Sequence, residues 1–207
     1  MKRLLVKVCG ITTKETAEAL VCFEPDMIGL VFACSPRKVT LQRAREIAKI
    51  ARKKQVRVVA VFQNQPLDEI LQTVALINID YVQLHGDEPV EFCKKISVKI
   101  IKAIKLKTSV DETKKIMESY KPFVDLFLVD RIEQGRGGLV DLKQVKELAG
   151  QYPILLAGGL NPENIKPILA EVGDVIRGVD VSGGVEKSAG IKDLAKVKSF
   201  ITKVRGY

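Results

Sequence analysis

A cysteine stands where a predicted buried strand gives way to a helix. The apolar residues 4–6 predict the strand, and Thr12 with Glu15 has the capping-box spacing of a helix start, so Cys9 lies at the end of the strand. Lys7 projects on the same side of that strand, and a cation beside a thiol lowers its pKa from about 8.5. The thiolate favoured in this way can act as a base or a nucleophile. Taken alone, Cys9 is better explained as a small core residue than as a base or nucleophile, so its role has to be judged from other residues.

A carboxylate, Asp130, follows the apolar run 126–129 in the same way. At the rim of an apolar core, partial burial raises the pKa of a carboxyl group toward the range of a useful acid. An aspartate that caps a helix or pairs with Arg131 explains the residue equally well. Together with Cys9, which comes from a strand across the mouth, Asp130 is instead predicted to be one half of an acid/base couple. The single histidine, His85, is either a ligand contact or a structural histidine bonded to a loop.

Glycine pairs end two of the later predicted strands. Gly158 and Gly159 follow one strand, and residues 182–184 follow Asp180 at the end of the next. Backbone N–H groups in such loops hold phosphate, and glycine lets the ligand approach closely. Together the two loops predict a phosphate site. Arg37 follows an earlier strand, where its planar guanidinium can bind a carboxylate through two parallel hydrogen bonds.

Short apolar runs recur along the chain with helix-like stretches between them, the pattern of parallel strands covered on both faces. The predicted strands are residues 3–9, 27–32, 57–62, 80–84, 98–104, 124–129, 153–157 and 175–181. Helix starts are predicted at Thr12, Thr40, Pro66, Pro89, Ser109, Asp141 and Asn161, and the last helix at 191–204. Strand–helix units of about 25 residues predict an α/β fold with one domain over residues 1–207, a (β/α)8 TIM barrel. An open doubly wound sheet is the alternative. The active site of such a barrel lies at the C-terminal ends of its strands, where all the residues above fall.

The charge balance excludes some partners. The net charge is +9, but only residues 52–54 form a basic run and aromatic residues make up 5%, so no stacking surface for nucleic acid is predicted. A field that attracts a small anion fits the charge better. No apolar run approaches the roughly 20 residues of a membrane span, and the N-terminus lacks the pattern of a signal peptide.

The four cysteines indicate neither a metal site nor a disulfide framework. Cys22, Cys34 and Cys93 form no C-x-x-C pair with one another or with Cys9, and with a single histidine no zinc site is predicted. Free thiols indicate a reducing, cytoplasmic location. We expect the three cysteines other than Cys9 to be packing residues.

The chemistry-bearing stretches form one ordered set: residues 7–12, 29–32, 35–37, 61–64, 83–86, 157–164, 180–186 and 190–193. This set spans essentially the whole chain and resembles the phosphoribosylanthranilate isomerases, enzymes of tryptophan biosynthesis. The resemblance implies a (β/α)8 barrel that needs no metal or organic cofactor. It implies an Amadori rearrangement of N-(5-phosphoribosyl)anthranilate to 1-(2-carboxyphenylamino)-1-deoxy-D-ribulose 5-phosphate.

The resemblance also implies roles for single residues. Cys9 stands at the family's general base and Asp130 at its general acid. Arg37 is expected to hold the anthranilate carboxylate, and His85 to contact the substrate. The residues expected at the phosphate are Gly158, Gly159, Asp180, Ser182 and Gly183. The expected partner is a small phosphorylated substrate, without nucleic acid or membrane, and the sequence leaves open whether the protein is a monomer or a homodimer.

Two departures from the family pattern leave alternatives open. Residues 134–142 lack the usual Gly-Gly-Ser/Thr-Gly followed by an aromatic residue, Asp and Trp, and Gly183 stands where a second serine is often found. A histidine-pathway sugar-phosphate isomerase is one alternative, but that family uses two aspartates and Cys9 speaks against it. A barrel that binds a phosphate ligand or nucleic acid without catalysis is the other.

Overall fold

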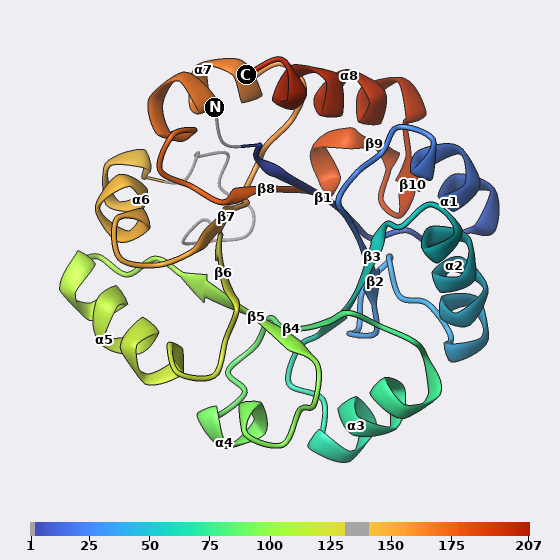
Figure 1. Ribbon diagram of the computed structural model, residues 1–207, viewed down its shortest axis with the longest axis horizontal. Helices are drawn as coiled ribbons and strands as arrows, with labels where there is room; N and C mark the ends of the chain where they lie inside the picture. Colours follow the sequence, from blue (N-terminus) through green and yellow to red (C-terminus); the bar gives the residue numbers. More distant parts are fainter. Residues whose placement is uncertain (1–2, 131–140) are drawn as a thin grey trace.

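Eight parallel strands close into a barrel. The structure, a computed structural model, describes residues 3–130 and 141–207. The strands are β1 (Leu5–Cys9), β2 (Met27–Val31), β3 (Arg57–Phe62), β4 (Tyr81–Leu84), β5 (Lys99–Lys105), β6 (Leu126–Asp130), β7 (Ile154–Leu156) and β8 (Gly178–Val181). Each strand pairs with the next, and β8 pairs with β1, so the barrel formed by these eight strands is closed (Figure 1). The predicted (β/α)8 barrel is therefore confirmed, and the open sheet is excluded.

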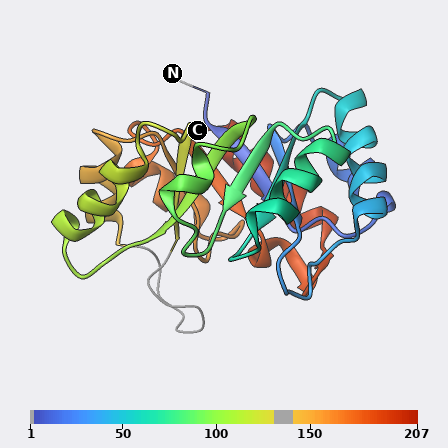
Figure 2. The same ribbon diagram turned by 90° about the horizontal axis from the view of Figure 1, so that it is seen from below.

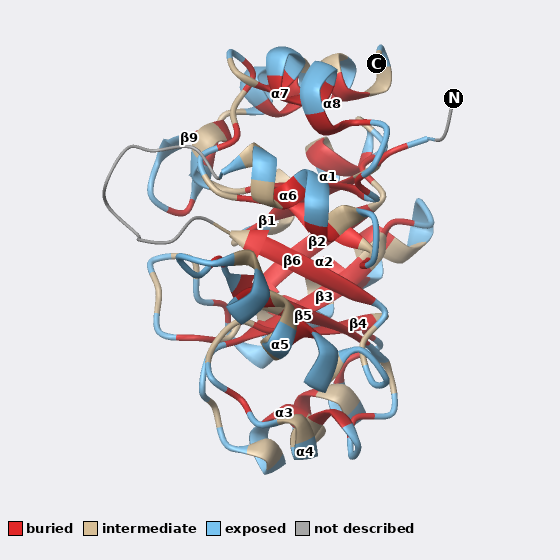
Figure 3. Cartoon of the chain, turned by 90° about the vertical axis from the view of Figure 1, so that its left-hand side faces the viewer, coloured by how far each residue is buried: buried red, intermediate tan, exposed pale blue. Residues whose placement is uncertain are grey.

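Helices follow the strands and surround them. They are α1 (Lys14–Val21), α2 (Leu41–Lys53), α3 (Leu67–Leu76), α4 (Val90–Cys93), α5 (Val110–Tyr120), α6 (Leu142–Ala149), α7 (Ile165–Val172) and α8 (Leu194–Arg205). After β8 come a 3-10 turn, η1 (Gly183–Val185), and a hairpin of β9 (Glu186–Ser188) and β10 (Ile191–Lys192). The helices lie along the outside of the strands (Figure 2), and their outer faces are exposed while the strands are buried (Figure 3).

Most helix starts follow the local capping residues that the sequence predicts. The side-chain oxygens of Thr40, Ser109 and Asp141 accept hydrogen bonds from backbone N–H groups in the first turns of α2, α5 and α6. These contacts satisfy donors that a helix leaves unpaired at its start. Pro66 and Pro89 stand one position earlier than predicted, at the caps of α3 and α4 rather than inside their first turns.

A contact that is distant in the sequence shifts the start of α1, and nearby structure shifts the starts of two other helices. Thr13, not Thr12, caps α1, because the hydroxyl of Thr12 donates to the carbonyl of Gly190 at 2.8 Å. The prediction for the last helix was also wrong at its start, since residues 191–192 pair with β9 and α8 begins after Asp193. The side chain of Asn161 caps a turn that precedes α7.

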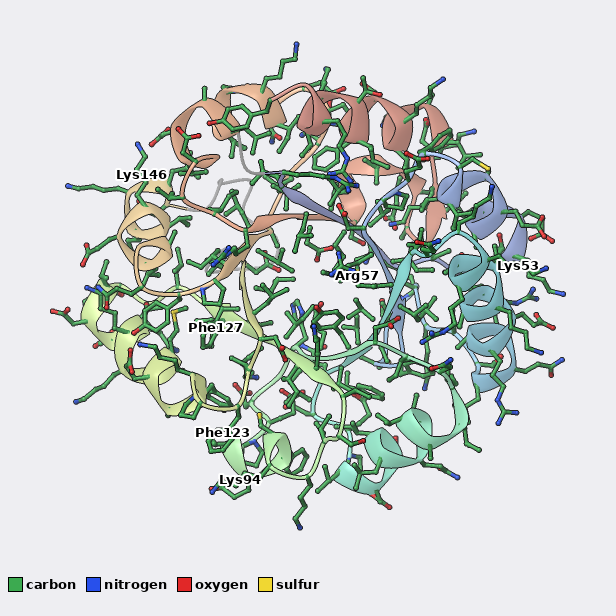
Figure 4. All side chains as sticks on the ribbon, viewed as in Figure 1. Lys53, Arg57, Lys94, Phe123, Phe127 and Lys146 are labelled. Atoms are coloured by element: carbon green, nitrogen blue, oxygen red, sulfur yellow. The ribbon has the colours of Figure 1, made fainter. Side chains whose placement is uncertain are left out.

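Side chains along the strands alternate between the barrel interior and the layer beneath the helices. On β6, Leu126 and Leu128 pack inside the barrel, whereas Phe127 and Val129 pack outward in the larger core. The ring of Phe127 meets Tyr152 edge-on, with ring centres 5.6 Å apart, and Figure 4 labels Phe127 between β6 and the helix ring. This alternation decides which side chains can reach the mouth of the barrel.

A buried ion pair joins two loops to β5. Lys102 on β5 and Glu88 after β4 are 3% and 2% exposed, and their Nζ and Oε2 atoms lie 2.9 Å apart. The ammonium also donates to the carbonyl of Gly86 at 2.6 Å, and Oε1 of Glu88 accepts from the backbone N–H of Asn64 at 2.9 Å. The pair therefore ties the loops after β3 and β4 to the barrel wall.

We expect Lys102→Met to lower the free energy of unfolding by about 3–5 kcal/mol, because it leaves the buried carboxylate of Glu88 without a compensating charge. Urea denaturation measures this loss. The control is Lys121→Met, which removes an exposed pair with Glu118 at 3.0 Å and should cost less than about 1 kcal/mol. Equal losses in the two variants would contradict the structural role given to Lys102.

Basic side chains are spread over the outer surface. Figure 4 labels Lys53, Lys94 and Lys146 at the outer edge of the helix ring, each on a different helix or helix end. None of the helices in the described residues is both long and apolar enough to cross a membrane.

The cysteine predictions are confirmed only in part. Cys93 is 4% exposed and packs in the core, as expected. Cys22 and Cys34 are exposed, so their prediction as packing residues is wrong. Cys22 comes directly after α1, and Cys34 lies in the loop after β2, where the chain faces solvent.

Candidate active site

A cavity of about 520 Å³ is lined by residues at the C-terminal ends of the strands. All the site residues that the sequence singles out contribute to its wall: Cys9, Arg37, His85, Asp130, Gly158, Gly159, Asp180, Ser182 and Gly183. The structure therefore brings these predicted residues together around one space. Arg131, which the sequence offers as another partner of Asp130, and the glycine-rich residues 135–138 lie outside the described residues.

Cys9 ends β1 with its side chain inside the barrel and is 8% exposed. It pairs in register with Gly29 of β2, where a Cβ atom would lie 2.6 Å from Sγ of Cys9. A side chain at position 29 would thus displace the thiol. On the other side, the hydroxyl of Ser182 donates to the carbonyl of Cys9 at 3.1 Å. Strand pairing and this hydrogen bond fix the backbone that carries the thiol.

Lys7 and Asp180 form a buried ion pair one step deeper in the barrel, with Nζ and Oδ1 2.9 Å apart. Burial opposes the charge on Lys7, but Asp180 and Cys9 raise the pKa of Lys7 above its usual value, so the ammonium stays charged. Burial raises the pKa of the Cys9 thiol, and Asp180 adds to the rise, whereas Lys7 and Lys192 oppose it. The predicted cation is present beside the thiol, but burial outweighs its effect.

Asp130 ends β6, and its side chain lies beside that of His85, which follows β4, at the mouth of the barrel. Oδ2 of Asp130 lies 3.8 Å from Nε2 of His85, which is longer than a hydrogen bond. Burial lowers the pKa of His85 below its usual value, although the charge of Asp130 opposes this, so the imidazole is neutral at pH 7. Nδ1 of His85 lies 2.7 Å from Nε2 of Gln83 on β4. The ring therefore belongs to the cavity wall and contacts a strand residue.

Arg37 binds a carboxylate of the chain itself. Its Nε and Nη2 donate to Oε1 and Oε2 of Glu186 at 2.8 and 2.7 Å, and Nζ of Lys192 donates to Oε1 at 2.8 Å. Burial opposes the charge on Glu186, but the hydrogen bonds from Arg37 and Lys192 lower its pKa below the usual value. The guanidinium keeps N–H donors that Glu186 does not use. This cluster connects the loop after β2 to the hairpin after β8.

The glycine loops after β7 and β8 lie against each other. Gly158 and Gly159 have φ angles of 86° and 74°, which an L side chain rarely adopts. A Cβ atom at Gly184 would collide with the carbonyl oxygen of Leu160. Both loops thus expose backbone to the cavity at a place where side chains would not fit.

Comparison with known proteins identifies the family. The sequence model described as "N-(5'phosphoribosyl)anthranilate (PRA) isomerase" matches residues 6–203. The chain belongs to this family. An N-(5'-phosphoribosyl)anthranilate isomerase of Oceanobacillus iheyensis is 38% identical over 211 residues, covering 98% of this chain and 97% of its own. One from Acetivibrio thermocellus is 37% identical over 219 residues, covering 97% and 95%.

Solved structures of phosphoribosylanthranilate isomerases share the fold. The crystal structure of the Thermotoga maritima enzyme matches with a TM-score of 0.87 and 32% identity, covering 99% of this chain and 100% of that one. A second structure, with a TM-score of 0.86, 32% identity and the same coverage, holds reduced 1-(o-carboxyphenylamino)-1-deoxyribulose 5-phosphate. As a member of the family, the chain is an enzyme, a phosphoribosylanthranilate isomerase of tryptophan biosynthesis.

Sequence reasoning missed three residues that shape the cavity of this isomerase: Gly29, Glu186 and Lys192. All three lie in stretches that resemble the family, but the sequence did not predict what these residues contact. Their contacts depend on chain segments that only the barrel brings together. Glu186 lies 149 positions from Arg37, and no local spacing predicts that pair.

Proposed function

We propose that the chain catalyses the family's Amadori rearrangement in this cavity, with Cys9 as general base and Asp130 as general acid. The observation that carries the proposal is that both side chains line the same cavity, although they come from β1 and β6. On the shorter way around the barrel, β7 and β8 separate these two strands. A sugar bound between them would have a proton donor on one side and a proton acceptor on the other.

The reaction steps follow from these two positions. The carboxyl group of Asp130 donates a proton to the furanose ring oxygen, the bond from this oxygen to C1 breaks, and the nitrogen lone pair forms a C1=N iminium. The thiolate of Cys9 removes the proton on C2, and the electron pair forms a C1=C2 double bond and neutralises the nitrogen. The enolamine then loses its enol proton and gains one at C1, which gives the ketone. Asp130 loses one proton and Cys9 gains one, so the charges balance.

The remaining cavity residues hold the ends of the substrate in this proposal. The backbone of Gly158, Gly159 and Gly183, with the hydroxyl of Ser182, surrounds the phosphate. The free N–H donors of Arg37 bind the anthranilate carboxylate. Asp180 does not contact the phosphate in this proposal, because its carboxylate would repel a phosphate dianion. It is already paired with Lys7, and it contributes to the site through that ion pair.

The test of this function is turnover of freshly made N-(5-phosphoribosyl)anthranilate by the purified protein. Loss of the anthranilate-type fluorescence over time measures the reaction, and we expect it to follow enzyme concentration. A protein that leaves the fluorescence unchanged across a wide pH range would exclude the proposed activity.

We expect Arg37→Met to raise KM for this substrate by about 10- to 100-fold, the effect of a lost charged hydrogen-bond pair, with a smaller change in kcat. Steady-state kinetics separate the two parameters. Glu186 keeps Lys192 as a partner in this variant, so the hairpin after β8 should stay in place. The control is Arg45→Met on the exposed face of α2, which should leave KM unchanged. A loss confined to kcat would contradict the binding role.

The proposed acid, the proposed base and the two glycine loops that line the cavity all belong to one barrel. The Thermotoga maritima isomerase is described as dimeric, and monomers have been generated from it. We propose that this chain is active as a monomer or as a homodimer alike. Its four free cysteines fit the reducing cytoplasm that we propose as its location.

A further inference from the structure

Gln83 carries a buried polar atom that no described residue satisfies. It lies on β4, is 1% exposed, and its side chain lines the cavity. Its Oε1 atom accepts no hydrogen bond from the part of the chain that the structure describes. Buried side-chain oxygens almost always have a partner, and leaving one unpaired costs about 1–3 kcal/mol. An atom of this kind at the wall of an active-site cavity points to a ligand.

Its neighbours in the sheet cannot supply the missing donor. Gln83 stands in register with Val61 on β3 and with Ile101 on β5, and both side chains are apolar and buried inside the barrel. The other polar atom of the amide, Nε2, is already engaged with His85. None of the residues that the structure describes supplies a donor for Oε1, and a molecule in the cavity that Gln83 lines can supply one.

The contact with His85 defines which ring nitrogen carries the proton. An amide nitrogen can only donate, so Nδ1 of His85, 2.7 Å from Nε2 of Gln83, must accept. In a neutral imidazole the proton then resides on Nε2. Nε2 is the nitrogen that lies 3.8 Å from Oδ2 of Asp130. The contact with Gln83 thus determines that the N–H group at Nε2 of His85, and not a bare nitrogen, faces Asp130, the proposed acid.

We propose that Gln83 binds a hydroxyl of the substrate's pentose through Oε1 and, through Nε2, holds His85 in the tautomer that directs Nε2–H toward Asp130. The proposal rests on the proposed function, because the pentose has to enter this cavity. The place of β4 in the barrel indicates that the group bound by Oε1 is a pentose hydroxyl. In the closed order of the strands, β4 stands opposite β8, whose loop is proposed to hold the phosphate. Arg37, after β2, is proposed to hold the anthranilate carboxylate, so the sugar between these two ends faces β4.

The first experiment tests the tautomer without any turnover. His85 is the single histidine of the sequence, so 15N labelling of histidine gives one imidazole whose two nitrogen signals report the tautomer. Near neutral pH we expect the proton on Nε2 in the wild-type protein. In Gln83→Glu, whose carboxylate can only accept, we expect it on Nδ1. A wild-type spectrum with the proton on Nδ1, or an unchanged tautomer in Gln83→Glu, would overturn the positioning role.

The second experiment tests the hydroxyl contact by calorimetry with two probes. One is reduced 1-(o-carboxyphenylamino)-1-deoxyribulose 5-phosphate, and the other is N-(5-phosphonooxypentyl)anthranilate, which keeps the carboxylate, amine and phosphate but has no pentose hydroxyl. We expect Gln83→Met to weaken binding of the first probe by about three- to tenfold and to change the second by less than about twofold. Equal weakening of both, or of neither, would overturn the contact.

A matched control separates this effect from a general one. Gln72→Met makes the same change on the exposed face of α3 and should alter neither binding constant. If the wild-type protein turns over no substrate and binds neither probe, the proposed function fails together with the hydroxyl contact. The tautomer measurement still decides the positioning role in that case, because it does not depend on the substrate.

Discussion

Replacing Asp130 with asparagine should lower kcat by a factor on the order of 10² or more, because the amide cannot donate a proton to the furanose ring oxygen. The effect should fall on kcat and on kcat/KM alike, since proton transfer is needed only in the transition state. The side chain of Asp130 is 26% exposed at the end of β6, and asparagine has nearly the same size, so the change creates no cavity in the core. Steady-state kinetics measure the loss, and thermal unfolding should give nearly the same Tm.

The matched control for this variant is Asp111→Asn in the first turn of α5, where the carboxylate is exposed and outside the cavity. It should keep kcat within about twofold, because a surface change of this kind alters stability by no more than about 0.5 kcal/mol. Turnover by Asp130→Asn close to that of the control would remove Asp130 from the mechanism. A large loss with a collapsed Tm would instead assign the residue to the fold.

The barrel was predictable because its signal repeats. Each strand is covered on both faces, so its sequence is a short apolar run without alternating polar residues. Runs such as 57–62 are therefore easy to recognise in the sequence. Helix starts were predicted well where the cap acts within one turn, as at Thr40 and Ser109. They were missed where a contact from far along the chain competes, as between Thr12 and Gly190.

The positions of the site residues were predictable for a similar reason. In a closed parallel barrel all strands end at the same rim, so polar residues that follow strands must meet there. What each of them contacts was not predictable. Lys7 and Asp180 are 173 positions apart and meet only because β8 pairs with β1, and Arg37 meets Glu186 only through the hairpin after β8.

Replacing Cys9 with alanine should also lower kcat by a factor on the order of 10² or more, because no other group in this position can accept the proton from C2. The fold should persist, since Cys9 is small and alanine fits the space that Gly29 leaves open. Cys22→Ala is the control, because Cys22 is exposed and outside the cavity. Wild-type turnover in Cys9→Ala would contradict the assignment of the base.

The pH profile of Asp130→Asn tests the same assignment from its electrostatics. In the wild-type enzyme the proposed mechanism needs the proton on Asp130 and the thiolate on Cys9, so both requirements shape the pH dependence, and Asp130→Asn leaves only the second. The reactive form of the base is the thiolate, and burial raises the pKa of Cys9 above its usual value, so less thiolate is present at neutral pH than for an exposed thiol. We therefore expect the residual kcat/KM of Asp130→Asn to rise with pH from neutral into the alkaline range, as the thiolate forms in the free enzyme. The double variant Asp130→Asn/Cys9→Ala should lack this rise. A flat profile in Asp130→Asn, or an equal rise in the double variant, would show that another group titrates and that the thiol is not the base.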